Sequence, residues 1–208
     1  MPHAIAITRP FYDDTTSYLH RWNLEVVKHA RITSSSVADL DRKRASRKEL
    51  ESVIKKLNPE ILILNGHGAQ DCILGQDNEV LVKVGENEYI LKNSIVFSLS
   101  CSSAKTLGPA SIKVGTKAYI GYKEDFIFAY TDGYSTRAEQ DPLAKLFLEP
   151  TNKIAMSLIS GNSPEDSHQR GLNAFSKNLQ QVLLSDSSEG YIARFLFWDL
   201  TNQTCLQR

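Results

Sequence analysis

The sequence predicts an α/β protein, a three-layer sandwich in which helices cover both faces of a mostly parallel sheet of about six strands. Short apolar runs alternate along the chain with longer amphipathic stretches, as is typical of such folds. Two runs, Glu60–Asn65 and Ser94–Ser100, consist largely of aliphatic and β-branched residues, which suits strands that are buried on both faces. The length of 208 residues fits a single domain over residues 1–208 better than two domains.

The first third of the chain predicts two strands and two helices. Ala4–Thr8 is a short apolar run that fits a central strand. Asp13–Thr16 supplies N-cap residues for a short helix, and Glu25–Ala30 is expected to form a second strand. Apolar residues at roughly helical spacing predict a long helix over residues 37–57, which Pro59 ends.

The middle of the chain predicts a small β-meander between the two buried strands. Short apolar runs within residues 72–91 are separated by Asp, Asn and Gly, which favour tight turns. A short helix over residues 104–114 and a strand over Lys117–Tyr122 are expected to follow. Residues 131–140 are polar and rich in turn residues, so we expect a mobile loop there.

The last third predicts helices followed by one more strand. Apolar residues fall at helical spacing over residues 142–148, 154–159 and 171–184. Pro164 follows a clear break in the pattern and fits the first position of a helix. The run Ala193–Leu200 is expected to form the final strand.

Composition excludes several classes of protein. The 24 basic residues balance the 24 acidic ones, which argues against nucleic acid or an anionic membrane as a direct partner. No apolar run approaches the roughly 20 residues of a membrane span, and the first residues do not resemble a secretion signal. Three cysteines at wide spacing suit a reducing compartment better than a disulfide framework, so we expect a cytoplasmic protein.

A histidine and a cysteine follow the two buried strands at the points where these strands end. His67 stands in Asn-Gly-His-Gly after the first strand, and Cys101 stands in Ser-Cys-Ser-Ser after the second. Either residue alone has an ordinary structural interpretation, as a tight turn or as a small buried side chain. Ligands of open α/β sheets bind at the carboxyl edge of the strands. The pair therefore predicts a thiol nucleophile with its acid–base partner.

Other kinds of site fit the sequence less well. Gly66-His67-Gly68 lacks the third glycine of a dinucleotide fingerprint, and neither a phosphate-binding loop nor a nucleophile-elbow serine is present. A metal held by His67, Cys72 and Cys101 would lack the paired ligand spacing typical of zinc sites. We therefore expect no cofactor and no metal. The charged run Asp41–Lys48 fits a solvated helix face better than a cleavage or docking site.

The stretch Ile61–Gly68, the stretch Ile95–Ala104 and the run Ala118–Tyr122 together resemble the caspase–hemoglobinase fold. Within that fold the chain looks most similar to CHAT-domain and gingipain- or clostripain-like cysteine peptidases. The resemblance covers about residues 59–123, and the Gln-Ala-Cys-x-Gly hallmark of caspases is absent, which argues against specificity for aspartate. It implies a caspase-like endopeptidase in regulated proteolysis, in stress or antiviral (phage) defence, with a protein or peptide substrate and an activating protein partner.

The resemblance also implies a mechanism for the residues of this chain. Cys101 as a thiolate would attack a peptide carbonyl, and His67 would give a proton to the departing amine. The backbone N–H groups of Gly68 and Cys101 are expected to form the oxyanion hole, since a glycine leaves its amide open to the substrate. No acid is singled out by the sequence as a third catalytic residue.

Substrate specificity is expected to come from an acidic side chain near the pocket. Relatives of this fold that cleave after Arg or Lys use such a residue, and Glu124, Asp125 and Asp132 follow the strand next to Cys101. Asp13 and Asp14, in the loop after the first strand, are further candidates. The alternative hypothesis is an interaction module that keeps the caspase-like fold without catalysis.

Overall fold

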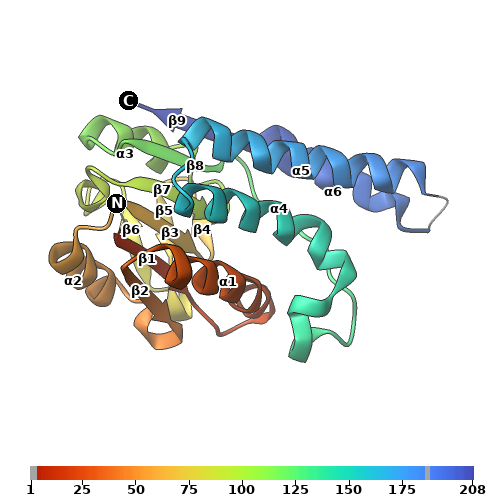
Figure 1. The fold of residues 1–208 in the computed structure, drawn as a ribbon, viewed down its shortest axis with the longest axis horizontal. Coiled ribbons are helices and arrows are strands. Elements are labelled where there is room, and N and C mark those ends of the chain that lie inside the picture. Colours follow the sequence, from red (N-terminus) through yellow and green to blue (C-terminus); the bar gives the residue numbers. More distant parts are fainter. Residues whose placement is uncertain (1–3, 186–187) are drawn as a thin grey trace.

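The computed structural model describes residues 4–185 and 188–208 and contains a six-stranded sheet in the order β2-β1-β3-β7-β8-β9 (Figure 1). The first five strands in this order are mutually parallel, and β9 runs antiparallel to β8. The strands of this sheet are β1 (Ala4–Arg9), β2 (Ser36–Asp41), β3 (Ile61–Asn65), β7 (Ile95–Leu99), β8 (Ala118–Tyr122) and β9 (Gln203–Gln207). The predicted mostly parallel sheet of about six strands is therefore confirmed.

A second, three-stranded antiparallel sheet lies between β3 and β7 in the chain. Its strands are β4 (Gly68–Ala69), β5 (Cys72–Leu74) and β6 (Val80–Lys83). This confirms the expected meander, except that Glu88–Leu91 forms a 3-10 turn instead of a strand. Five 3-10 turns occur among the described residues, over Arg42–Arg44, Gln76–Asn78, Glu88–Leu91, Ser135–Gln140 and Ser188–Ile192.

Helices cover both faces of the large sheet. On one face lie α1 (Asp14–Thr33) and α4 (Pro142–Ile159). Beside α4, α5 (Pro164–Leu184) contacts β8 and β9, and α6 (Ala193–Asn202) packs against α5. On the other face lie α2 (Arg47–Leu57) and α3 (Leu107–Val114). Figure 1 shows α5 and α6 extending together beyond the edge of the sheet. None of the described helices is long and apolar enough to cross a lipid bilayer.

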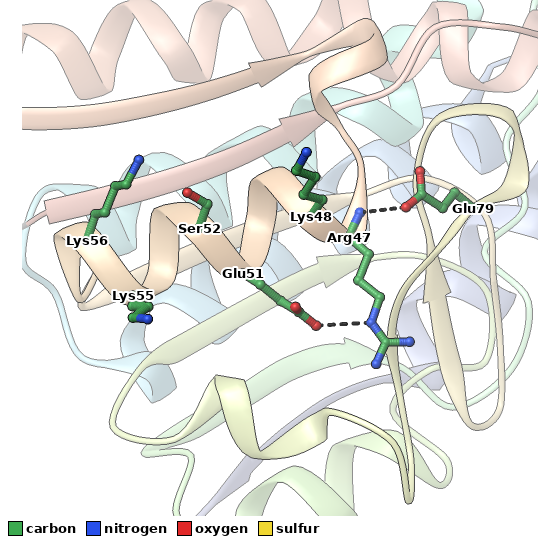
Figure 2. A pocket seen from close by; sticks show the side chains of 7 residues that line it. All are labelled: Arg47, Lys48, Glu51, Ser52, Lys55, Lys56 and Glu79. Carbon is green, nitrogen blue, oxygen red and sulfur yellow. Dashed lines mark hydrogen bonds and ion pairs between the residues drawn. The ribbon is translucent and has the colours of Figure 1, made fainter.

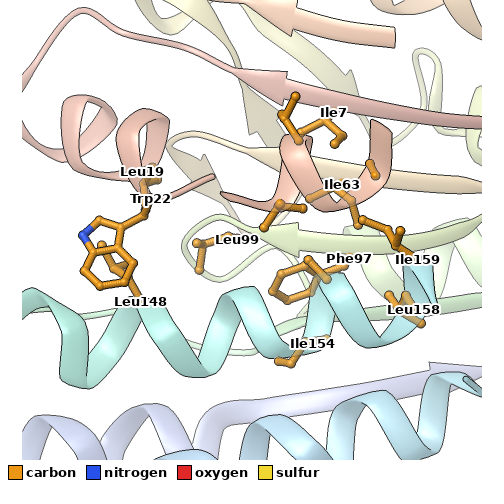
Figure 3. Packing of buried hydrophobic residues seen from close by; sticks show 14 of the residues in the cluster. Ile7, Leu19, Trp22, Ile63, Phe97, Leu99, Leu148, Ile154, Leu158 and Ile159 are labelled. Atoms are coloured by element: carbon orange, nitrogen blue, oxygen red, sulfur yellow. The ribbon is translucent and has the colours of Figure 1, made fainter. Parts of the chain in front are cut away.

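Alternation along the strands divides the core between the two faces. Ile7, Ile63 and Phe97 point toward α1 and α4, where they meet Leu19 of α1 and Leu158 of α4 (Figure 3). Their chain neighbours in the same strands, such as Leu62 and Val96, point toward α2 and α3. Successive side chains of a strand point to opposite sides of the sheet. Because helices cover both sides, both sets of side chains are buried. Hence these strands read as continuous apolar runs.

Two expected strands are helices instead. Glu25–Ala30 was expected as a strand and lies inside α1, so that prediction was wrong. Its Val-Val pair suggested a strand, but Trp22, Val26 and Ala30 are buried at helical spacing and continue one face of the helix. Ala193–Leu200 was also wrongly expected as a strand, because its aromatic residues belong to α6, which buries Ala193, Leu196 and Asp199 along one side.

The expected helix over residues 37–57 is correct only in its second half. Ser36–Asp41 forms β2, an edge strand, and α2 begins at Arg47 after a cap by Ser46. β2 was not expected because its two aspartates are unusual in a strand of a parallel sheet. Asp39 is paired with the buried Arg9 of β1 at 2.8 Å, so a charge on this strand is satisfied within the sheet.

The helices expected over residues 142–148 and 154–159 form one helix, α4. Pro150 lies inside it and has no N–H to donate to the carbonyl of Leu146. The side chain of Asn178 on α5 donates to that carbonyl instead, at 2.7 Å, which offsets the lost helical bond. Pro164 occupies the first turn of α5, as predicted.

Candidate active site

The two neighbouring strands β3 and β7 bring the segments that carry His67 and Cys101 into contact. The strands are paired in parallel up to Asn65 and Leu99. A Cβ atom on Gly68 would lie 2.9 Å from the carbonyl oxygen of Cys101, closer than real Cβ contacts allow. Gly68 therefore lets the chain after β3 pass directly against the chain after β7. The expected meeting of the two strand ends is present in the structure.

A tight turn directs His67 out of β3. Gly66 has φ +147°, and a Cβ atom there would lie only 2.1 Å from the carbonyl oxygen of Leu74. The carbonyl of His67 then accepts a hydrogen bond from the N–H of Leu74 at 2.9 Å. The small antiparallel sheet thus holds the backbone on both sides of this histidine.

The imidazole of His67 is paired with Asp13, which the sequence did not single out as its partner. His67 Nε2 lies 2.7 Å from Asp13 Oδ2. The other oxygen, Asp13 Oδ1, accepts from the N–H of Thr16 at 2.8 Å and caps α1. The cap fixes the carboxylate, and the carboxylate orients the ring. An ionised carboxylate only accepts hydrogen bonds, so Nε2 carries the proton that is donated to Asp13, and in a neutral ring Nδ1 is then an acceptor.

The charge of Asp13 is consistent with this role. Burial alone would raise the pKa of its carboxyl group, but the hydrogen bonds from Thr16 and His67 hold that pKa below its ordinary value. Asp13 is therefore ionised at neutral pH. A signal for the pair existed in the sequence, since Asp13 follows β1 and β1 lies beside β3, but that adjacency becomes visible only in the sheet order.

A network of buried hydroxyl groups supports the turn that carries Cys101. Ser98 and Ser100 lie 2.6 Å apart between their Oγ atoms, and Ser100 donates to Ser103 at 2.9 Å. Tyr119 of β8 donates to Ser103 at 2.9 Å. All four side chains are buried, so this network satisfies polar groups that would otherwise be costly under the turn.

The same turn is fastened to the end of β8. Ser102 adopts the left-handed conformation with φ +55°, donates its N–H to the carbonyl of Glu124 at 3.1 Å, and donates its hydroxyl to Asp125 at 2.8 Å. Ala104 N–H donates to the carbonyl of Tyr122 at 3.0 Å. A strained residue that its surroundings fix in this way is common at functional sites.

The thiol of Cys101 is in a less polar setting than the imidazole. Its Sγ contacts the carbonyl oxygen of Phe126 at 3.9 Å. Burial raises the pKa of this thiol, and the carboxyl groups of Asp125 and Asp199 raise it further when they are ionised. In this structure Cys101 is therefore a thiol and not a thiolate at neutral pH.

Residues 125–127 lie beside the partly exposed Cys101 and are hydrogen-bonded to α6. Trp198 donates its indole N–H to the carbonyl of Asp125 at 2.8 Å, and the N–H of Ile127 donates to Asp199 Oδ1 at 3.0 Å. Asp199 is fully buried, and its Oδ2 has no hydrogen-bond partner among the described residues. Burial raises the pKa of Asp199 well above its ordinary value. The sequence had given no reason to associate α6 with the site.

The three acids expected near the substrate pocket differ in their surroundings. Glu124 forms an ion pair with Lys105 at 2.9 Å. Asp125 is exposed and accepts from Ser102, and Asp132 is exposed in the loop before Ser135. Asp125 lies close enough to Cys101 to influence the thiol. Across residues 4–185 and 188–208, no three His, Cys, Asp or Glu side chains are grouped so that they could hold a metal ion.

Comparisons with known proteins support the fold. The structure of the complex of Porphyromonas gingivalis RgpB pro- and mature domains aligns with a TM-score of 0.60 and 9% sequence identity, over 99% of this chain and 47% of that one. This chain thus spans about half the length of that chain. A second structure, an alanine–glyoxylate aminotransferase from Nostoc sp., aligns at 12% identity over 91% of this chain and 57% of that one, with a TM-score of only 0.33.

Sequence comparison adds nothing further. No family model matches the chain. No curated protein matches it either. At 9% identity the likeness to RgpB concerns the fold alone. The chain therefore has a caspase–hemoglobinase type of fold, as the sequence resemblance implied, while its kinship to CHAT-domain proteins stays a prediction.

Proposed function

We propose that this protein is a cysteine endopeptidase in which Cys101 is the nucleophile, His67 the general acid–base and Asp13 the residue that orients His67. The observation that carries the proposal is the contact of the two strand ends at Gly68, combined with the ion pair of His67 and Asp13. A nucleophile, a base and an orienting carboxylate from three strand ends form the arrangement that activated nucleophiles require.

The reaction would proceed by acyl transfer. His67 Nδ1 takes the thiol proton, Cys101 Sγ bonds to the carbonyl carbon, and the carbonyl oxygen becomes an oxyanion. The N–H groups of Gly68 and Cys101 would stabilise that oxyanion, since Gly68 lies against Cys101 without a side chain. His67 then gives the proton to the leaving amine as the C–N bond breaks. Water, deprotonated by His67, hydrolyses the thioester and restores the thiol.

A peptide library tests the proposal directly. The wild type should cleave, and Cys101→Ala and His67→Ala should each lose more than about 10³-fold in kcat/KM. Cys205→Ser is the matched control, because Cys205 is partly exposed on β9 and has no role in the mechanism. Equal cleavage by all four proteins would refute the proposal.

Cleavage after Arg or Lys is the specificity that we propose, with Asp125 as the first candidate for the pocket acid and Glu124 and Asp132 as further ones. Asp125 is supported by its electrostatic influence on Cys101, whereas Glu124 already has Lys105 as a partner. Asp125→Asn should lower kcat/KM for Arg and Lys substrates by about 100-fold, because a substrate cation that becomes buried on binding needs a carboxylate partner. Wild-type preference for an acidic or apolar residue would contradict this assignment.

The contact of Cys101 with the carbonyl of Phe126, together with the raised pKa of the thiol, favours a regulated enzyme that becomes active when residues 125–127 move. We propose that a protein partner activates it in a stress or defence pathway. The same observation also suits the second candidate, an interaction module without catalysis. Thiol labelling with iodoacetamide separates the two, because an enzyme should expose a reactive Cys101 in at least one condition in which it cleaves, whereas a module should never do so.

A further inference from the structure

A pocket of about 660 Å³ lies between the end of α1 and the antiparallel helices α4 and α5. Its position is remote from the candidate active site. His29 lines the pocket near the end of α1, whereas Asp13 caps the beginning of that helix. The intervening helix is roughly 22 Å long at 1.5 Å per residue. The pocket is therefore no part of the peptide-binding site.

Two facing stripes of side chains form the walls of this pocket. Lys153 and Met156 line it from α4, and Arg170, Asn173 and Lys177 line it from α5. Within each helix these residues are three or four positions apart, so they lie on one side. The floor consists of two small buried residues, Ser157 and Ala174, which leave a groove between the long side chains above them.

Positive charge in the pocket is largely uncompensated. No carboxylate lines it, and no ion pair is formed by Arg170 or Lys177 within the described part of the chain, although Asp166 lies one turn before Arg170. Lys153 has a partner, Glu149, at 2.9 Å. Glu149 lines an adjacent hollow with Lys177, but two exposed cations on one stripe of a pocket that no carboxylate lines favour an anionic ligand.

In a second hollow on the surface, carboxylates accompany the basic side chains. The pocket of about 770 Å³ along α2 is also rich in basic residues, but Glu51 and Glu79 line it as well (Figure 2). Arg47 is paired there with Glu51 at 3.0 Å and with Glu86 at 2.9 Å. Its guanidinium is therefore already satisfied, and this hollow serves as the internal control for the α4–α5 pocket.

Among the uncharged side chains of the α4–α5 pocket, Asn173 presents free hydrogen-bond donors, whereas the donors of Ser160 and of His29 Nε2 are used within the protein. Ser160 donates its hydroxyl to the carbonyl of Met156 at 2.8 Å, so its oxygen accepts from His29 Nε2 at 2.9 Å. Asn173 accepts from Gln169 through its Oδ1 at 2.9 Å, which leaves its amide N–H groups to donate. Donors of this kind beside Arg and Lys match the oxygens of a phosphate group.

We propose that this pocket binds a small phosphorylated molecule of nucleotide size. Arg170 and Lys177 hold the phosphate oxygens, Asn173 donates a further hydrogen bond, and Met156 and Ala174 contact the less polar part of the ligand. The volume lies within the usual range of about 300–1,000 Å³ for small-molecule sites. The proposal does not depend on the peptidase assignment.

Isothermal titration calorimetry with ATP, inorganic tripolyphosphate and adenosine tests this proposal on the full chain. ATP should bind, and tripolyphosphate should bind more weakly. The double variant Arg170→Gln/Lys177→Gln should weaken both by at least about 10-fold, and added salt should do the same. These two side chains are exposed, so their replacement leaves the core unchanged.

The control is Arg47→Gln/Lys48→Gln in the hollow along α2, which removes the same number of charges and should leave ATP binding unchanged. Equal losses in both double variants would show nonspecific attraction and overturn the proposal. Failure of ATP and tripolyphosphate to bind, or tighter binding of a polyglutamate peptide than of either phosphate probe, would also overturn it.

Discussion

The two main residues of the candidate site, His67 and Cys101, differ in how their surroundings suit the proposed reaction. His67 is partly exposed, paired with an ionised Asp13 and held between two turns. Cys101 contacts the carbonyl of Phe126, and partial burial raises the pKa of its thiol. For the proposed mechanism, His67 is thus oriented by its carboxylate partner, while Cys101 is a thiol with a raised pKa. In the proposed mechanism, activation would act on residues 125–127, which lie beside Cys101.

Removing the charge of Asp13 should have the largest effect, because it changes the surroundings of His67. Asp13→Asn keeps an N-cap for α1, because asparagine caps helices about as well as aspartate, but it removes the carboxylate beside His67. We expect kcat/KM to fall by about 10²–10⁴-fold with an unchanged Tm. Asp14→Asn is the control. Unchanged activity in Asp13→Asn would mean that the ion pair has no catalytic part.

Adding a methyl group at Gly68 tests the contact between the two strand ends. The Cβ of Gly68→Ala would lie 2.9 Å from the carbonyl of Cys101 and 2.9 Å from Ser100 Cβ, so the two strand ends must separate. We expect kcat/KM to fall by about 100-fold, since a displacement of about 1 Å can cost that much. Gly190→Ala, in open space, should have no effect. Similar kinetics in both variants would contradict the proposed oxyanion site.

Loosening the link between α6 and residues 125–127 should make the thiol of Cys101 more reactive. Trp198→Phe removes the hydrogen bond to the carbonyl of Asp125. The thiol of Cys101 should then become better solvated and its pKa should fall, so iodoacetamide labelling at pH 7 should be several-fold faster than in the wild type. Phe197→Leu, at the exposed neighbouring position, is the control. Labelling that stays at the wild-type rate would exclude Trp198 as a latch.

The smallest effect concerns Asp199, which holds the same segment. Its pKa is raised by burial, so the folded state binds a proton more tightly than the unfolded state. Its contribution to stability is therefore complete below the ordinary pKa of aspartate and is lost as the pH rises through the raised value. Asparagine does not ionise, so Asp199→Asn should reduce this loss of stability. The Tm of the variant should therefore fall less than that of the wild type between pH 5 and pH 9. Parallel Tm profiles for the two proteins would contradict the assigned shift.

The apolar runs alone identified the two strands that carry the site. Ile61–Asn65 and Ile95–Leu99 are buried on both faces, which requires an uninterrupted apolar sequence and makes the strands visible without a structure. The positions of His67 and Cys101 follow from the strand ends. The approach of the two strand ends was predictable, because neighbouring parallel strands release the chain at one edge of the sheet.

Elements with mixed polarity were decided only by tertiary packing. Glu25–Ala30 has the residues of a strand but extends one face of α1 against the sheet, and β2 has the charges of a loop but pairs with β1 through Asp39 and Arg9. Local preference for helix or strand is weak, amounting to at most about 1 kcal/mol per residue, and burial against neighbours overrides it.

The partners of the two site residues were likewise beyond the sequence. The strand order places the end of β1 beside the end of β3, and so brings Asp13 to His67 across 54 positions of the chain. Trp198 and Asp199 reach residues 125–127 from a helix near the C-terminus. The sequence singled out His67 and Cys101 as the residues proposed to react, because the chemistry of an imidazole and a thiol is local. The tertiary structure alone decided which side chains orient or restrain them, because such contacts join segments that carry no mark of each other in the sequence.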